Sequence, residues 1–408
     1  MIGRKVHAMP HTTTELRFAS GLSEMVSTVA ALDEVLNELT ATLSPPVDLA
    51  VVFASADHAG SFDLIHERVV RGLGPRTVLG VTAEGVIGRR REVEAGAPGL
   101  SILAARLGGA TVTPFNDEQL DLDALKESPE SLREQIGAGD APVRAMLMLA
   151  DPFSIPMVSL LPTLGLAFPA VPVVGGMASG AEKPGGNRLL LNGRVTNRGA
   201  IAVTIGGDLR VDCTVSQGCR PIGQPCVITR SQRHVIQEIG GQNSLVVVQQ
   251  LLESLDGRDR HLVQNKGLLV GRVINEYKER FGRGDFLIKH IVGVDEDSGY
   301  IAIADPQVRV GQTIQFHVRD DRTAEEDFRM LLQAQQLHGA ADGALLFSCN
   351  GRGTRLFEQP NADVQMVHDA LGDLPLAGFF AAGEFGPVGG ENFVHGHTAS
   401  LMVMRAGK

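Results

Sequence analysis

The sequence has few aromatic side chains, with no Trp and only two Tyr among its 408 residues. Proteins that bind single-stranded nucleic acid commonly stack the bases on such side chains. The formal net charge of −10 also disfavours binding to phosphate backbones and to anionic membrane surfaces. We therefore expect no nucleic-acid partner.

Long apolar runs are absent as well. No stretch reaches the roughly 18 apolar residues that a membrane-spanning helix needs, and the polar start of the chain lacks the apolar core of a signal peptide. We expect no membrane insertion and a cytoplasmic location. The spacing of Cys213, Cys219 and Cys226 fits no zinc or iron–sulfur pattern, so we predict reduced cysteines.

Glycine, in contrast, is abundant, with 48 residues, and it gathers in loops that follow apolar strands. The clearest loop is Gly378-Phe-Phe-Ala-Ala-Gly-Glu-Phe-Gly-Pro-Val-Gly-Gly390, and looser versions run over residues 79–88 and 174–180. Such density indicates backbone with unusual φ angles or in very close contact with a neighbour. We expect these loops to border a bound ligand.

The glycine loops belong to a repeated unit of strand, helix, strand and strand. The strands of the first unit lie near Val51, Val78 and Ile102, and the second and third units begin near Ala145 and Leu345. The predicted fold class is therefore α/β: two similar α/β halves built from these units, with mixed sheets and covering helices.

Several further elements follow from local patterns. The helical period over residues 23–43 predicts a helix capped by Ser23, and Thr323-Ala-Glu-Glu326 predicts a capping box. A degenerate fourth unit is expected over residues 268–314. We predict a polar N-terminal segment at 1–22, a first domain at 23–225 and a second at 226–408, with the junction within residues 206–240.

Ligands of open α/β sheets bind at the carboxyl ends of the strands. This edge would collect Asp57 and the following candidate ligand-binding residues: Thr82, Glu84, Met177, Ser179, Ser348, Cys349, Asn350, Arg352, Gly383, Glu384, Gly386, Asn392 and His395. Arg352 could hold a carboxylate with its guanidinium fork, and Glu84 or Glu384 could meet an ammonium group. That combination suits a zwitterion such as an amino acid.

Other chemistry stays open. Cys349 could be a nucleophile if a histidine lowered its pKa, or simply a small buried residue, and Glu384 could serve as a base. His395-Gly-His397 would place two imidazoles on one face of a strand. Two ligands are too few for a zinc site, so we predict no metal, but a single histidine could bind haem.

These motifs resemble the FIST family, a module of FIST N and FIST C domains, over roughly residues 28–405. The resemblance lies in residues 79–88, 174–179 and 215–223, and most specifically in 344–353, 378–390 and 395–400. It implies an intracellular sensor that binds an amino acid or related metabolite, with haem-based gas sensing as an alternative. We expect no fused output domain beside the two parts, so a separate kinase, chemotaxis receptor or cyclase would receive the signal.

Overall fold

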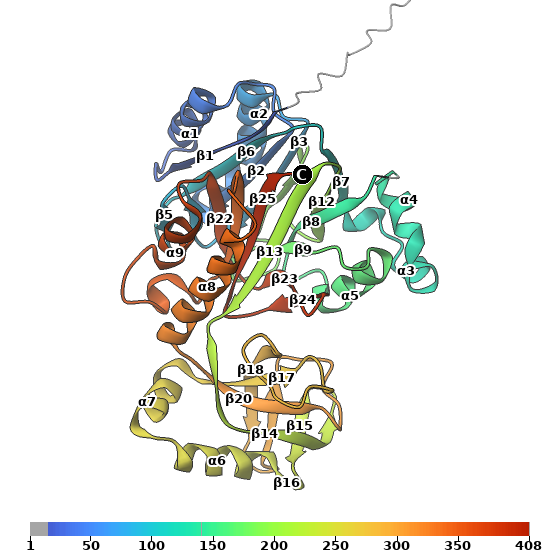
Figure 1. Cartoon of the computed structure of the whole chain (residues 1–408), viewed down its shortest axis with the longest axis vertical. Helices are drawn as coiled ribbons and strands as arrows, with labels where there is room; N and C mark the ends of the chain where they lie inside the picture. Colours follow the sequence, from blue (N-terminus) through green and yellow to red (C-terminus); the bar gives the residue numbers. More distant parts are fainter. Residues whose placement is uncertain (1–14, 140, 408) are drawn as a thin grey trace, which may run out of the picture.

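The computed structural model describes residues 15–139 and 141–407, so residues 1–14 of the predicted polar segment lie outside it. Figure 1 shows a large α/β body above a smaller domain made mainly of strands. The predicted α/β class with mixed sheets and covering helices is confirmed. Within the described residues, no helix is both long and apolar enough to cross a membrane.

Three six-stranded sheets form the body. The first sheet has the order β1 (Leu16–Ser23), β6 (Leu100–Leu107), β2 (Leu49–Ser55), β3 (Thr77–Ala83), β10 (Leu189–Leu191) and β11 (Arg194–Thr196). The second has β7 (Thr111–Asn116), β12 (Ala200–Gly206), β8 (Val143–Ala150), β9 (Val173–Met177), β23 (Glu384–Val388) and β24 (Glu391–His395). The third has β13 (Leu209–Gln217), β25 (Thr398–Ala406), β21 (Gly343–Cys349), β22 (Leu376–Ala381), β4 (Val86–Gly88) and β5 (Arg91–Val93).

The predicted unit of strand, helix, strand and strand is confirmed in the centre of each of the three body sheets. Each sheet contains one parallel strand pair, namely β2 with β3, β8 with β9, and β21 with β22. A helix connects the two strands of each pair, and the third strand of the unit lies antiparallel beside the first. The six parallel strands are nearly continuous apolar runs because both faces of each sheet are covered.

The hairpin of each unit pairs with a sheet of another unit. Hairpin β4–β5 of the first unit joins the third sheet, β10–β11 of the second joins the first sheet, and β23–β24 of the third joins the second sheet. The glycines lie near these joints. A Cβ on Gly378 would lie 1.8 Å from the carbonyl oxygen of Leu346, and Gly175 has a φ of +145°. The predicted close approach of backbones is therefore an approach of strands to one another.

Helices cover the outer faces of the sheets. They are α1 (Thr28–Thr42) and α2 (Phe62–Leu73) on the first unit, α3 (Leu122–Glu127), α4 (Leu132–Ile136) and α5 (Met157–Ala167) on the second, and α8 (Asp321–Gln336) and α9 (Ala362–Leu371) on the third. The inner faces meet in one central core. In it the ring of Phe53 lies 5.3 Å from that of Phe379 and 6.1 Å from that of Phe347, between centroids.

The smaller domain is an antiparallel barrel inserted between β13 and α8. Its strands are β14 (Cys219–Gln232), β20 (Thr313–Arg319), β17 (Leu268–Val273), β18 (Phe286–Asp295), β19 (Tyr300–Ile303), β15 (Val235–Ile239) and β16 (Gln242–Asn243), and its helices are α6 (Ser244–Ser254) and α7 (Gly257–Lys266). Strand β14 pairs with both β20 and β15, which closes the barrel. The predicted fourth unit is wrong, because β17, β18 and β20 pair antiparallel and no helix joins β17 to β18.

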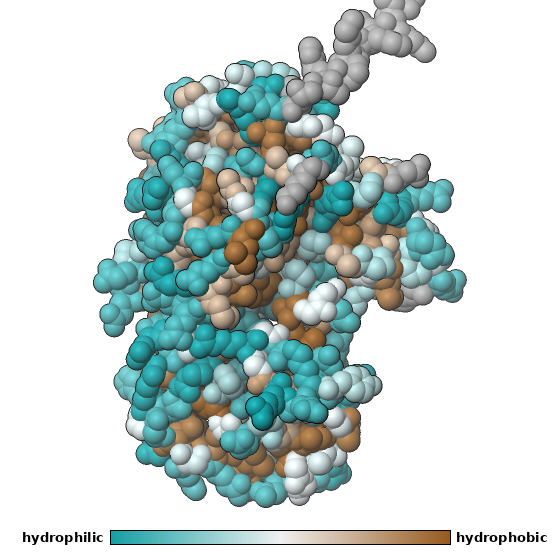
Figure 2. Space-filling view, viewed as in Figure 1, coloured by the Kyte–Doolittle hydropathy of each residue, from teal (hydrophilic) through white to brown (hydrophobic). Residues whose placement is uncertain are grey.

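The chain passes from the body into the barrel at Gly218 and returns at Asp320, whose N–H donates to the carbonyl of Gly218 at 3.3 Å. Figure 2 shows a notch between body and barrel on the right of the view, with hydrophobic residues beside it. The domain limits at residues 225 and 226 stay predictions.

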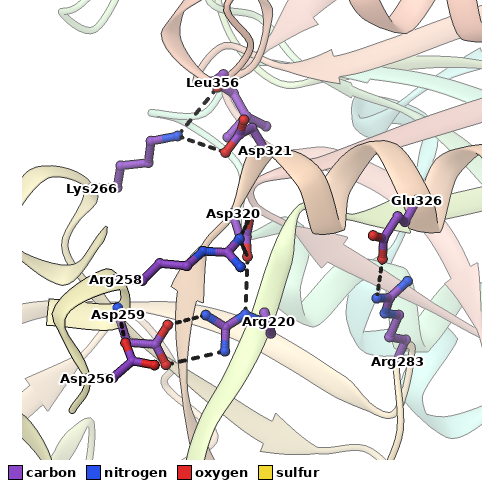
Figure 3. Close-up of polar contacts among 10 residues, drawn as sticks. All are labelled: Arg220, Asp256, Arg258, Asp259, Lys266, Arg283, Asp320, Asp321, Glu326 and Leu356. Carbon is purple, nitrogen blue, oxygen red and sulfur yellow. Dashed lines mark hydrogen bonds and ion pairs between the residues drawn. The ribbon is translucent and has the colours of Figure 1, made fainter. Parts of the chain in front are cut away.

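Ion pairs reinforce this junction. Figure 3 shows Arg220 and Arg258 converging on Asp320, with nitrogen–oxygen distances of 3.1 Å and 2.9 Å. Farther along α8, Arg283 of the barrel pairs with Glu326 at 3.0 Å. Because Asp320 is almost fully buried, its two arginines supply the charge compensation that burial requires.

Two predicted helix starts are wrong. Helix α1 begins at Thr28 with Ser27 as its cap, because Ser23 ends strand β1, which pairs with β6 along its whole length. Helix α8 begins at Asp321, so Thr323 lies inside the helix and forms no capping box.

Phe53→Ala tests the central core. We expect the free energy of unfolding to fall by about 3–5 kcal/mol, because the cavity would open where all three sheets meet. Denaturant unfolding measures the change, and Tyr277→Ala, at a side chain 97% exposed, serves as the control with about 0.5 kcal/mol or less. Equal losses in both variants would contradict a shared core.

Candidate functional site

A cavity of about 760 Å³ lies where the carboxyl ends of the six parallel strands meet. Every one of these strands contributes to its wall at or just after its last residue. The wall consists of Ser55, Ala56, Asp57, Glu84, Gly96, Ala97, Pro152, Phe153, Ser179, Gly180, Ala181, Glu182, Asn350, Arg355 and Ala382. We call this space the central cavity.

Hydrogen bonds tie the three strand-end loops together beside the cavity. The hydroxyl of Ser179, after β9, donates to the carbonyl of Phe380 in β22 and accepts the N–H of Glu84, after β3, at 2.9 Å. The N–H of Met177 donates to the carbonyl of Gly383 at 2.8 Å. One side chain, Ser179, therefore links all three units, and the wall is held by contacts between them.

One ion pair stands at the wall of the central cavity. Arg355, at the end of the short 3-10 helix η4 (Gly353–Arg355), is hydrogen-bonded to Glu84 and also donates to the carbonyl of Asn350 at 2.7 Å. The bond to Glu84 raises the pKa of Arg355. Both side chains stay partly exposed, at 50% for Arg355 and 25% for Glu84, so a ligand can reach them.

The other charged side chains of the wall are acidic. Asp57 accepts the hydroxyl of Ser55 at 2.9 Å, and Glu182 is exposed. A second cavity of about 170 Å³ shares Glu84, Asn350 and Arg355 with the first and adds Glu94 and Arg352. The wall thus offers both signs of charge, with negative charge in excess.

Four of the residues predicted for this edge line the central cavity, namely Asp57, Glu84, Ser179 and Asn350. Arg355 also lines the cavity but was not among the predicted site residues, although it lies shortly after Asn350 and Arg352 in the segment that follows β21. Arg352 instead forms a buried pair: its Nε and Nη2 donate to the two carboxylate oxygens of Asp363 at 2.8 Å and 2.6 Å. The guanidinium fork predicted for a ligand is therefore already used within the chain.

Ser348 belongs to the same buried group, since its hydroxyl also bonds the carboxylate of Asp363. Glu384 is fully buried, and one of its oxygens accepts the N–H and hydroxyl of Thr398 at 3.1 Å and 2.7 Å. Burial raises the pKa of Glu384 to about 8, and burial together with the nearby Glu384 raises the pKa of Cys349 to about 12.

The remaining predicted residues hold strands together. Thr82 accepts the N–H of Arg188 at 2.8 Å, and Asn392 accepts the N–H of Val173 at 2.8 Å. Met177 and Gly383 form part of the β9–β23 joint, where Met177 Cε would meet a Cβ on Gly383 at 3.0 Å. A Cβ on Gly386 would meet Val215 Cγ2 at 2.3 Å, so Gly386 permits close packing of β13.

His395 and His397 of the C-terminal motif lie in different backbone environments. His395 ends β24, and its Nε2 contacts the carbonyl of Gly386 at 3.0 Å, whereas His397 lies in the following turn with a φ of +63°. The expectation that both share one strand face is wrong, because the strand stops at His395. No group of three or more potential metal ligands forms among residues 15–139 and 141–407.

The haem alternative can be compared with the cavity wall. Axial haem ligands in proteins are commonly His, Cys, Met or Tyr, and none of these types is among the described residues that line the central cavity. His395 is enclosed within its own strand pair. These residues do not fit a haem ligated in the central cavity.

Comparison with known proteins gives two adjoining family matches. Residues 48–242 match the FIST N domain and residues 245–387 match the FIST C domain. An uncharacterized protein of Mycobacterium tuberculosis (strain ATCC 25618 / H37Rv) is 36% identical over 355 residues, which cover 86% of this chain and 90% of the relative. An uncharacterized protein of Mycobacterium bovis (strain ATCC BAA-935 / AF2122/97) is also 36% identical, with 86% and 89% covered.

Glu384→Gln should change how stability depends on pH. The pKa of Glu384 in the folded protein, about 8, lies above the ordinary value of 4.5. Protonated Glu384 therefore contributes stability that is complete below pH 4.5 and is lost as pH rises through about 8. Glutamine stays neutral, so the variant gains stability relative to the original protein with rising pH, by at most about 1.4 kcal/mol per pH unit.

Denaturant unfolding of both proteins between these two pH values measures the difference. The exposed Glu391→Gln is the matched control, with no comparable gain. A difference for Glu384→Gln that stays constant over this range would mean that Glu384 is ionised throughout in the folded protein.

Proposed function

Because the chain belongs to the FIST family, whose domains are sensory domains of signal transduction, we propose that its central cavity is the sensing site for an amino acid or a closely related metabolite. The observation that carries this proposal is the ion pair between Glu84 and Arg355 at the wall of a large cavity. A volume of about 760 Å³ lies in the range typical of small-molecule sites.

The charges of the wall match the two ends of a zwitterion. Arg355 would receive the carboxylate, since its guanidinium is planar and only half-buried. Glu84 and Asp57 would receive the ammonium group. A bound amino acid could thus separate Arg355 from Glu84 and give each of them a new partner, which replaces one exposed ion pair with two inside a cavity.

Binding at this place would act on all three units together. The wall draws on the ends of six strands, and Ser179 already links the three loops. A ligand that contacts these loops would shift the population of their arrangements in proportion to its differential affinity. We propose that a separate kinase, chemotaxis receptor or cyclase in the cytoplasm reads this shift.

The environment of Cys349 argues against the nucleophile alternative. Reactive cysteines have lowered thiol pKa values and partial exposure, whereas Cys349 is buried and its pKa is raised to about 12. Glu384 has a pKa suited to a base, but it is fully buried and does not line the central cavity. We therefore propose binding without chemical conversion.

Arg355→Gln and Glu84→Gln test the site. Each removes one charge from the wall, so the dissociation constant for any amino acid that binds should rise about tenfold or more, as expected for the loss of a charge-assisted hydrogen bond. Isothermal titration with the common amino acids and small carboxylates measures this constant. Arg329→Gln on the outer helix α8 is the control and should bind as the original protein does.

Two results would contradict the proposal. One is the absence of heat and of thermal stabilisation with every compound in the panel. The other is binding that Arg355→Gln and Glu84→Gln leave unchanged, which would place the ligand elsewhere.

A further inference from the structure

A second group of polar side chains lies where the barrel joins the body. Five of its buried atoms have no hydrogen-bond partner, out of nine such side-chain atoms among the described residues. They are Nε of Arg319, Nη1 of Arg352, Oε1 of Glu384 and both ring nitrogens of His397. We call these four residues the junction cluster.

The members of the junction cluster are close to one another although they come from separate elements. A Cβ on Gly218 would lie 3.0 Å from Nη1 of Arg352 and 3.0 Å from the carbonyl oxygen of His397. Arg319 donates to the carbonyl of Gly351, next to Arg352. The residue after His397, Thr398, donates to Glu384 at 3.1 Å.

The cluster spans both parts of the molecule. Arg319 is the last residue of barrel strand β20, whereas Arg352, Glu384 and His397 belong to the body. On the barrel side, His290 of β18 packs on His397 with 4.4 Å between ring centroids. Contacts here therefore connect the barrel to the body.

Positive charge dominates the cluster. Arg352 is neutralised by Asp363, but Arg319 has no ion-pair partner within the described residues. Burial, followed by the charge of Arg319, lowers the pKa of His397 to about 3, so the imidazole is neutral at pH 7. Burial raises the pKa of Glu384 to about 8, so this carboxyl is largely protonated there as well.

Four of the five unpartnered atoms are nitrogens, and those that carry a hydrogen could donate to an anion with several acceptor oxygens. Buried polar groups without partners are costly, and a guanidinium pairs best with planar oxygen pairs. A side chain at position 218 would crowd this guanidinium, because a Cβ there would lie only 3.0 Å from Nη1 of Arg352. Three of the four residues, Arg352, Glu384 and His397, are more than nine-tenths buried, which favours a small anion over a bulky one.

We propose that the junction cluster binds a small planar oxyanion, of the size of formate, bicarbonate or nitrate, between Arg319 of the barrel and Arg352, Glu384 and His397 of the body. The anion contacts both parts, so its occupancy stabilises the barrel in its present position against the body. None of the four residues lines the central cavity itself, and Arg352 alone of them lines the smaller cavity beside it.

Thermal unfolding at constant ionic strength tests this site. Sodium formate, bicarbonate and nitrate are each titrated against sodium gluconate, whose anion is too bulky for the cluster. We expect at least one small anion to raise the melting temperature of the original protein, and its apparent dissociation constant to be about tenfold or more weaker in Arg319→Gln. The matched control is Arg230→Gln, an exposed arginine of the same barrel, which should respond as the original protein does.

A second measurement separates loss of anion binding from poor folding of a variant. Isothermal titration of the original protein with the stabilising anion should give a single site, and His397→Ala should weaken it without abolishing folding. The proposal is overturned if no anion differs from gluconate, or if Arg319→Gln and Arg230→Gln respond alike. Amino-acid binding is measured on the same Arg319→Gln protein, so loss of one site is distinguished from loss of the other.

Discussion

The exchange of hairpins between units is the constraint on which the rest of this structure depends. Without it, β3, β9 and β22 would each expose an unpaired strand edge, which proteins generally cover. The incoming hairpins cover these edges and bring the ends of all six parallel strands to one place. The central cavity lies where these strand ends meet.

Charged residues that are close in sequence have different roles because they are buried to different extents. Arg352 and Arg355 are three residues apart, yet one is enclosed with Asp363 and the other is half-exposed beside Glu84. The enclosed pair fixes the loop after β21, because breaking it would leave a buried charge. The exposed pair costs little to rearrange, since surface ion pairs contribute little to stability. The rigid pair can therefore support the adaptable one.

The repeat was predictable because strand and helix periods are local, and a helix connects the two parallel strands of each predicted unit. The edge where Glu84, Ser179 and Asn350 meet followed from the rule for strand ends. Hairpin exchange could not be predicted, because it pairs residues as distant as Gly176 and Glu384. The sequence also could not tell Arg352 from Arg355, because the difference depends on the side chain of Asp363, which meets Arg352 only in the folded structure.

Hairpin exchange also bears on how the chain is made. The hairpin β4–β5 can pair with β22 only after β22 has left the ribosome, almost three hundred residues later. In the same way, β9 can pair with β23 only after β23 has been synthesised. During synthesis the first two units therefore hold an unattached hairpin and an uncovered edge for most of the process. Unpaired strand edges readily pair with other chains, so we expect this risk to last until the last unit is complete.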